Sequence, residues 1–298
     1  MSIPFQNIKS GLLLLLFGLT ITTTLQAEIS VNDDDGQRVI IQQPANRIIS
    51  LAPHITESLF AAGAGEKVIG AVAYSDYPEA ARKIPRVGGY PTLDIETIIS
   101  LKPDLIIAWA SGNNMNQVNK LSALGIPVFK SEPRNPLDIA NTIRRFGILA
   151  GTTEISKKAS SEFIQHYQRL KKQYSSKNKI KVFYQFWNNP IMSINGKHLI
   201  SKVINLCGGI NVFSGLHSIT PKVSIEAVIA TKTDVIIAGD KGKKKSQWMS
   251  EWAHWKQIPA VKNRQIYFID PDLLNRAGPR ILQGADKLCL TLDKVRKN

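Results

Sequence analysis

The sequence predicts an α/β protein built from two Rossmann-like lobes, joined by a single long backbone helix, with a ligand cleft between the lobes. Three observations lead to this prediction. After Arg47, short apolar runs alternate with helix-like segments. The stretch 154–174 contains neither glycine nor proline. A pattern of apolar and charged residues in the first half also recurs in the second half at a constant offset.

Residues 1–27 have the features of a secretory signal peptide. Lys9 precedes an apolar run over 11–21, and a polar stretch then ends at Ala27. The run is shorter than the about 20 apolar residues that cross a bilayer, which favours a cleaved leader over an N-terminal anchor. We therefore expect cleavage after Ala27 and a periplasmic protein.

Residues 28–150 are predicted to form the first α/β lobe. The alternation of strands with helices indicates parallel pairing. The expected strands are 47–51, 67–73, 104–109 and 127–130, and the expected helices are 55–62, 95–101, 115–124 and 137–150.

Residues 151–178 are predicted to form the linking helix. One helical stripe over 154–174 is apolar and consists of Ile155, Ala159, Phe163, Tyr167, Leu170 and Tyr174. At 1.5 Å per residue, such a helix is about 30 Å long. A single helix between lobes permits rocking but not wide closure, so we expect a largely pre-formed cleft.

Residues 179–298 are predicted to form the second α/β lobe. Its expected strands are 182–186, 234–238 and 265–269, and its expected helices are 198–206, 225–231, 246–255 and 282–297. The segment 95–108 matches the segment 225–238 at an offset of 130 residues, as 225 − 95 gives. The match includes three charged pairs: Glu96 with Glu226, Lys102 with Lys232, and Asp104 with Asp234. It predicts two related lobes.

The net charge of +15 is typical of proteins that bind nucleic acid or an anionic membrane surface. The basic residues gather in 169–181 and 241–245 without the interleaved aromatic residues of a stacking surface, so we interpret them as solvated faces and expect no nucleic acid. The sequence lacks GxxxxGK[ST], HExxH and GxSxG. We therefore expect no enzyme activity, no catalytic residue and no cofactor.

The five histidines lie scattered, without the spacing of metal ligands, so no metal site is expected. His54 directly follows the first strand, where open α/β sheets bind their ligands. Three roles stay open for it: a residue lining the cleft, an axial ligand to a metal centre, or a surface residue.

Aromatic residues follow several of the predicted strands. Tyr74 comes after the second strand, Trp109 ends the third strand, and Phe186 ends the first strand of the second half, while Tyr90 precedes the helix that carries Glu96. Aromatic loops at strand ends suit a large flat ligand, although the same residues also suit packing between lobes.

Two pairs of residues leave alternatives open. Cys207 and Cys289 are the only cysteines; the oxidising periplasm favours a disulfide, and two separately buried thiols are the alternative. Glu96 and Glu226 lie in the first turns of equivalent helices, where an acid complements the helix dipole. The same two acids also suit docking onto arginines of a partner.

Several motifs make the chain resemble the periplasmic cobalamin-binding proteins of vitamin importers. They are RIISLAP at 47–53, YSDYP at 74–78, LKPDLIIAW at 101–109 and RAGPR at 276–280, and the resemblance covers nearly all of the mature chain. Those proteins belong to the class of solute-binding proteins with one backbone helix, which also serves haem and ferric siderophores.

The resemblance implies the roles of specific residues. We expect cobalamin as the transported ligand, and as partner an inner-membrane ABC permease with its ATPase subunits, to which the protein docks as a monomer. Ligand contacts are implied for Tyr74, Tyr90, Trp109, Phe186, Asp272, Leu273, Leu274, Asn275 and Arg276. Glu96 and Glu226 fall on an acidic pair that docks onto permease arginines, and Cys207 and Cys289 fall on a disulfide.

The chain also departs from the family's pattern. Tyr90 stands in place of a tryptophan, Leu273 in place of an aromatic residue, and the segment 217–221 lacks a tryptophan. Fewer large rings weaken stacking or change which lower ligand of the corrinoid is accepted. Haem or a ferric siderophore is the alternative ligand.

Overall fold

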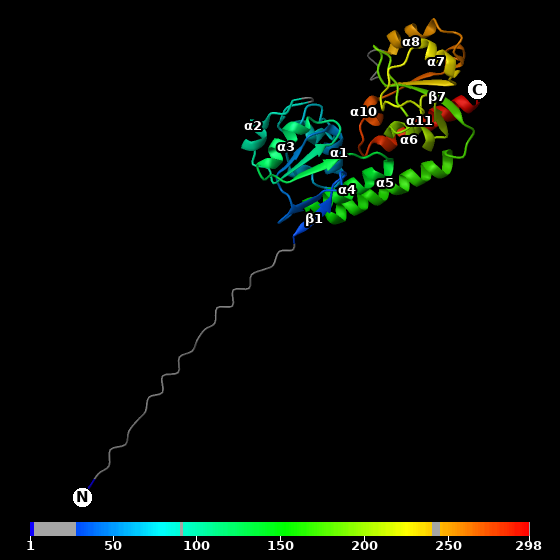
Figure 1. The fold of residues 1–298 in the computed structure, drawn as a ribbon. Helices are drawn as coiled ribbons and strands as arrows, with labels where there is room; N and C mark the ends of the chain where they lie inside the picture. The colour runs from blue at the N-terminus through cyan, green and yellow to red at the C-terminus, as the bar shows by residue number, and fades with distance from the viewer. Residues whose placement is uncertain (3–27, 90–91, 240–244, 298) are drawn as a thin grey trace.

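The chain forms two α/β lobes that stand on a base of long helices, as the computed structural model shows (Figure 1). The structure describes residues 1–2, 28–89, 92–239 and 245–297. Almost all of the predicted signal peptide therefore lies outside the described residues, and so does Tyr90. No helix in these ranges is both long and apolar enough to cross a membrane.

The first lobe contains a sheet of four parallel strands in the order β4-β3-β5-β6. Its strands are β3 (Ile48–Ser50), β4 (Val68–Ala71), β5 (Leu105–Trp109) and β6 (Val128–Ser131). Helices cover both faces: α1 (Pro53–Ala61) and α4 (Pro136–Ala150) on the inner face, α2 (Ile95–Ser100) and α3 (Met115–Ala123) on the outer face.

Side chains along β5 point alternately to the two faces of the sheet, and they are apolar on both faces. Leu105 and Ile107 belong to the core cluster with α1 and α4, whereas Ile106 and Ala108 belong to the cluster with α2 and α3. All four side chains are fully buried. A strand apolar on both faces is typical of parallel sheets between two helical layers.

The second lobe repeats this arrangement, with parallel strands in the order β10-β9-β7-β8. Counted along the chain, both lobes have the strand order 2-1-3-4. The strands are β7 (Ile180–Gln185), β8 (Gly209–Asn211), β9 (Val235–Gly239) and β10 (Ile266–Ile269). The helices are α6 (Leu199–Leu206), α7 (Ile225–Thr231), α8 (Lys245–Ala253), α9 (Pro259–Lys262), α10 (Pro271–Leu274) and α11 (Ile281–Lys297).

The sequence repeat corresponds to the same local structure in both lobes. Lys102 and Lys232 both have positive φ, 46° and 49°, where the chain turns from helix into strand. The aspartate two residues after each lysine accepts a backbone N–H near the start of a neighbouring strand: Asp104 from Arg47, and Asp234 from Lys181. The repeated lysine and aspartate therefore build one helix-to-strand turn twice.

The linking helix α5 (Thr153–Tyr174) runs beneath both lobes in Figure 1. Its 22 residues span about 33 Å at 1.5 Å per residue. The expected stripe is correct at Phe163, Leu170 and Tyr174, which are buried. It is wrong at Ile155, which is 56% exposed, because α5 meets α4 through small side chains. A Cβ placed on Gly147 of α4 lies 2.0 Å from the Ser156 hydroxyl, so the two helices approach too closely for larger residues.

Several short elements were not predicted from the sequence. They are the antiparallel hairpin of β1 (Ile29–Asn32) and β2 (Arg38–Ile41), strand β8, the 3-10 turns η1 (Gly65–Lys67) and η2 (Glu79–Lys83), and helices α9 and α10. Elements of three to five residues are too short to show a hydrophobic period.

A continuous core unites the two lobes. One cluster of buried residues contains Leu59 of α1, Phe146 of α4, Phe163 of α5, Val203 of α6 and Leu288 of α11. The inner faces of both sheets rest on this same helical base. The lobes are therefore joined by shared packing as well as by the single helix α5.

Candidate ligand-binding site

The carboxyl ends of the strands in both lobes place their loops at the junction between the lobes (Figure 1). In each sheet the strand order reverses between the first and third strands, β3 and β5 in one lobe and β7 and β9 in the other. Open α/β sheets bind ligands in the crevice at that reversal. Most candidate residues lie on these loops.

Tyr74 is held in an exposed position by the loop after β4. Its side chain is 79% exposed, and its backbone has φ 65°, in the left-handed region. The loop is fixed on both sides: the N–H of Ala73 donates to Gly88, and the N–H of Asp76 donates to the Tyr74 carbonyl. Backbone strain of this kind gathers at functional sites, where the surroundings enforce it.

Trp109 ends β5 and lies half-buried against His54. The two rings meet edge to face, with centroids 5.2 Å apart. The backbone N–H of Trp109 donates to the side-chain oxygen of Asn113, and the side-chain amide of Asn113 donates to the Leu51 carbonyl. A Cβ on Gly112 falls 1.9 Å from the indole, so only glycine at 112 leaves room for the ring in this position.

His54 is buried, which makes the surface interpretation wrong. Its exposure is 5%, and its Nε2 is buried without a hydrogen-bond partner. Burial, with a smaller effect from the charge of Arg276, lowers its pKa to about 4. The imidazole is therefore neutral at neutral pH.

Phe186 follows β7 and stands opposite His198, with ring centroids 5.9 Å apart. Burial lowers the pKa of His198 to about 4. Its Nδ1 accepts the N–H of Ile200 and caps helix α6. The next residue, Trp187, is 59% exposed and provides a second aromatic ring at this strand end.

The expected segment 272–276 contains the short helix α10, which Asp270 caps by accepting the N–H of Asp272. Leu273 and Leu274 point inward and are 7% and 1% exposed. Asn275 accepts a hydrogen bond from the Tyr184 hydroxyl, whose pKa is raised by burial. Ligand contacts from these three residues stay predictions.

Arg276 stands at the centre of an ion-pair network that joins the lobes. It contacts Glu57 of α1 at 3.1 Å, Asp76 of the loop after β4 at 2.9 Å, and Asp272 of its own lobe at 3.1 Å. Arg280 contacts the same Glu57 and stacks 3.9 Å above the Tyr77 ring. We call these five charged side chains the junction network.

Sequence reasoning did not identify the junction network. Arg276 and Arg280 occur in the quoted RAGPR motif, but their partner Glu57 lies 219 and 223 residues away in the chain. No local periodicity reports such a pairing. The only sequence signal is the presence of an arginine pair in RAGPR and isolated acids near the first two strands.

Glu96 and Glu226 lie exposed in the first turns of α2 and α7. The preceding caps are equivalent: Asp94 accepts the N–H of Thr97, and Ser224 accepts the N–H of Ala227. Backbone and Ser224 hydrogen bonds lower the pKa of Glu226. The two lobes thus present one exposed acid each, at matching positions.

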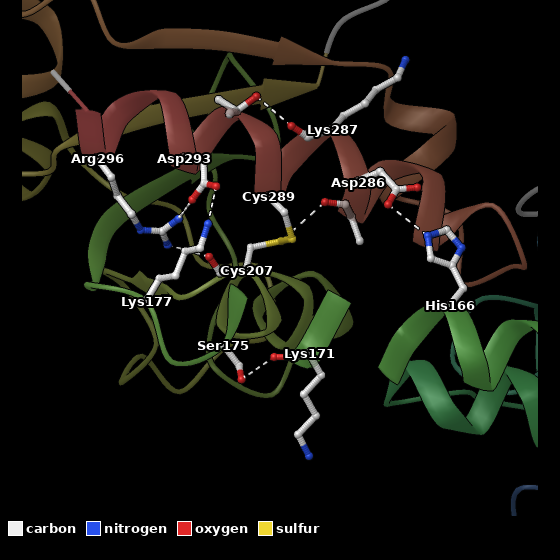
Figure 2. Close-up of a disulfide and its surroundings, with 12 residues drawn as sticks. His166, Lys171, Ser175, Lys177, Cys207, Asp286, Lys287, Cys289, Asp293 and Arg296 are labelled. Atoms are coloured by element: carbon white, nitrogen blue, oxygen red, sulfur yellow. Dashed lines mark hydrogen bonds and ion pairs between the residues drawn. A yellow bond between two sulfur atoms is a disulfide. The ribbon is translucent and has the colours of Figure 1, made fainter. Parts of the chain in front are cut away.

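Cys207 and Cys289 form a disulfide, as predicted (Figure 2). It connects the end of α6 to the middle of α11, and both cysteines are fully buried. Figure 2 also shows Asp293 of α11 accepting from Lys177 and Arg296. Within the described residues, no group of three His, Cys, Asp or Glu side chains gathers as a metal site.

Comparison with known proteins yields one family. The model of the periplasmic binding protein family matches residues 48–273. The vitamin B12-binding protein of Vibrio cholerae serotype O1 is 38% identical over 255 residues, which cover 85% of this chain and 91% of that protein. The vitamin B12-binding protein of Yersinia pestis is 36% identical over 253 residues, 85% of this chain and 88% of that protein.

Solved structures agree with the sequence comparison. The crystal structure of the periplasmic vitamin B12 binding protein BtuF of Vibrio cholerae superposes with a TM-score of 0.80 at 38% identity, covering 86% of this chain and 99% of that one. The periplasmic haem-binding protein HutB of the same organism has a TM-score of 0.73 at 21% identity, covering 83% and 98%, and shares the fold. This two-lobed chain therefore belongs to the periplasmic binding protein family.

Proposed function

We propose that the chain captures cobalamin between its two lobes in the periplasm and delivers it to an inner-membrane ABC permease with ATPase subunits. The observation that carries this proposal is the junction itself. Exposed aromatic rings, Tyr74 on one lobe and Trp187 on the other, belong to strand-end loops of lobes that meet at a network of paired charges. The two vitamin B12-binding relatives support the choice of ligand.

The charges of the junction network favour cobalamin over haem. Arg276 and Arg280 are both paired with acids, and the network holds three carboxylates for its two arginines. Haem brings anionic propionates, which need unpaired cations. The corrin ring of cobalamin carries neutral carboxamides, which donate to carboxylates and accept from guanidinium groups without a net charge change.

Aromatic loops supply the apolar part of binding. Tyr74, Trp109 and Phe186 lie at or after strand ends in the two lobes, and none of them is fully buried. Aromatic side chains each bury about 150–250 Å² in an interface, which suits a flat macrocycle. Tyr90 and the segment 272–276 complete the set of proposed ligand contacts.

Delivery rests on the exposed acids. Glu96 and Glu226 sit at matching positions on the two lobes and are available to pair with arginines of the permease. In this proposal a monomer carries the ligand, the protein only binds and releases it, and cleavage after Ala27 frees it into the periplasm.

A panel of ligands tests the proposal. Purified protein lacking 1–27 is titrated with cyanocobalamin, haemin and a ferric siderophore, each followed by calorimetry and absorbance. We expect one cyanocobalamin per chain and much weaker binding of the others. Tyr74→Ala should weaken cyanocobalamin binding, whereas Ile155→Ala, an exposed position on α5, should leave it unchanged. Tight haemin binding with a shifted Soret band, and none for cyanocobalamin, would overturn the choice of ligand.

A further inference from the structure

Glu57 is a buried carboxylate that receives arginines from the opposite lobe. It lies one turn into α1, and its side chain is 1% exposed. Its Oε1 accepts from Arg276 at 3.1 Å and from Arg280 at 2.7 Å, and its Oε2 accepts from the Arg280 Nε at 3.0 Å. The Glu57 to Arg280 contact is thus a two-bond fork, the strongest geometry for this pair of groups.

The arginines are fixed from their other sides as well. Arg276 holds Asp76 of the first lobe and Asp272 of the second, and only 13% of its side chain is exposed. The Arg280 guanidinium stacks over Tyr77 of the first lobe. Arg276 is therefore paired both within its own lobe and across the lobe boundary, and both contacts of Arg280 reach across that boundary.

The backbone of the second lobe approaches α1 closely at the same place. A Cβ on Gly278 lies 3.2 Å from the Glu57 Oε2 and 3.4 Å from the His54 Cβ. Gly278 sits between Arg276 and Arg280 in sequence. The loop that carries both arginines therefore rests directly on the start of α1, at a separation that the ion pairs define.

Glu57 is the most deeply buried member of the network, with 1% of its side chain exposed, so its carboxylate depends on the two arginines for compensation. Asp76 is more exposed, at 39% of its side chain, and its contact is correspondingly screened by water. His54 adds no charge at neutral pH, because burial lowers its pKa to about 4.

We propose that Glu57 is a positioning residue that clasps the two lobes through Arg276 and Arg280 and sets the width of the gap between them before any ligand arrives. The clasp holds Arg276 ready beside the aromatic loops. It adds to the single helix α5, which alone leaves rocking of the lobes free. Since the clasp acts in the empty protein, the inference does not depend on which ligand is taken.

Distances between the lobes in the ligand-free protein test this proposal. Spin labels are attached at Lys120→Cys on α3 and Ala230→Cys on α7, both exposed positions. The two native cysteines form a disulfide, so the labels react only at the new sites. Pulsed electron resonance then gives the distribution of the interlobe distance. We expect one narrow distribution in the otherwise native chain and a broader one, shifted to longer distances, in Glu57→Gln.

Two further variants make the result decisive. Asp34→Asn breaks a part-buried ion pair with Arg145 inside the first lobe and should leave the interlobe distances unchanged. Arg280→Lys keeps the charge balance around Glu57 but removes the fork, and should broaden the distribution even if Glu57→Gln folds poorly. Unchanged distributions in Glu57→Gln, or in Arg280→Lys where the former does not fold, would overturn the proposal.

Ligand binding gives a second readout. If the clasp keeps the competent gap populated, then a variant that reaches this gap one tenth of the time binds about tenfold more weakly. We expect the loss mainly in the association rate, because binding then waits for the lobes to align. If the native chain does not bind cyanocobalamin, the proposed ligand is wrong. The interlobe distances would still test the clasp in that case.

Discussion

Tyr74 combines an exposed ring with a backbone conformation that disfavours side chains. A non-glycine residue in the left-handed region costs about 1–2 kcal/mol. The loop nevertheless keeps φ at 65° there, with the ring 79% exposed. The exposed ring adds little to the core, and the ligand contact proposed for Tyr74 would account for a tyrosine at this place.

Substitutions at Tyr74 separate strain from binding. We expect the free energy of unfolding of Tyr74→Gly to be about 1 kcal/mol higher than that of Tyr74→Ala, because glycine adopts the left-handed conformation without a steric penalty. Both should lower cyanocobalamin affinity about tenfold through loss of one ring contact. Urea unfolding and calorimetry measure the two effects. Equal stabilities of the two variants would show that the loop relaxes and that Tyr74 is not strained.

His198 predicts how stability depends on pH. Its pKa is about 4 in the folded chain and about 6.5 when unfolded, so the unfolded chain binds more protons between these values. Stability contributed by the neutral imidazole is present above about pH 6.5 and falls as pH drops towards 4, by about 3 kcal/mol at most. His54 has the same direction of shift and adds to the trend.

A matched substitution isolates this contribution. Asparagine is a good N-cap, so His198→Asn keeps the cap of α6 while removing the titration. We expect the loss of unfolding free energy between pH 7 and pH 4 to shrink in this variant relative to the native chain. An unchanged pH dependence would mean that His198 is not the titrating group.

At the scale of elements, the disulfide ties α6 to α11 across 82 residues. The chain-entropy model gives about 4–5 kcal/mol for a loop of this length, before any native strain. We expect Cys207→Ser with Cys289→Ser to lower the free energy of unfolding by up to this amount without changing ligand stoichiometry. Denaturant unfolding measures it. Full stability in the double variant would show that the shared helical base holds the lobe without the bond.

Helices α2 and α7 carry the proposed docking acids, which predicts a separation of binding from transport. Glu96→Ala with Glu226→Ala should lower uptake in a reconstituted transporter several-fold and leave cyanocobalamin affinity intact. Glu162→Ala, an exposed acid on α5, is the control and should change neither. Reduced ligand affinity in the double variant would contradict a docking role.

Most long elements were predictable because their signals are local. The continuous apolar run in 104–109 and the stretch 154–174 without glycine or proline indicate a buried strand and a long helix from sequence alone. The close approach of Gly147 to Ser156 is a tertiary property, so the exposure of Ile155 was not predictable. Among the candidate residues, the aromatic residues at strand ends could be predicted because each of them directly follows or ends a predicted strand in the sequence. The pairing of Glu57 with Arg280 was missed because it joins positions 223 residues apart.

For the whole molecule, shared packing and the junction network both limit relative motion of the lobes. One core cluster runs from α1 through α4, α5 and α6 to α11. In addition, Glu57 of α1 pairs directly with Arg276 of the other lobe. A protein joined at both places loses little conformational freedom when a ligand arrives, which favours tight binding.

The most direct measurement is a crystal structure of the chain with cyanocobalamin. The account predicts one corrin ring at the junction, contacted by Tyr74 from one lobe and by the segment 272–276 from the other, with Glu57 still paired to Arg280. A corrin ring bound on an outer face of either lobe, away from Tyr74, would contradict it.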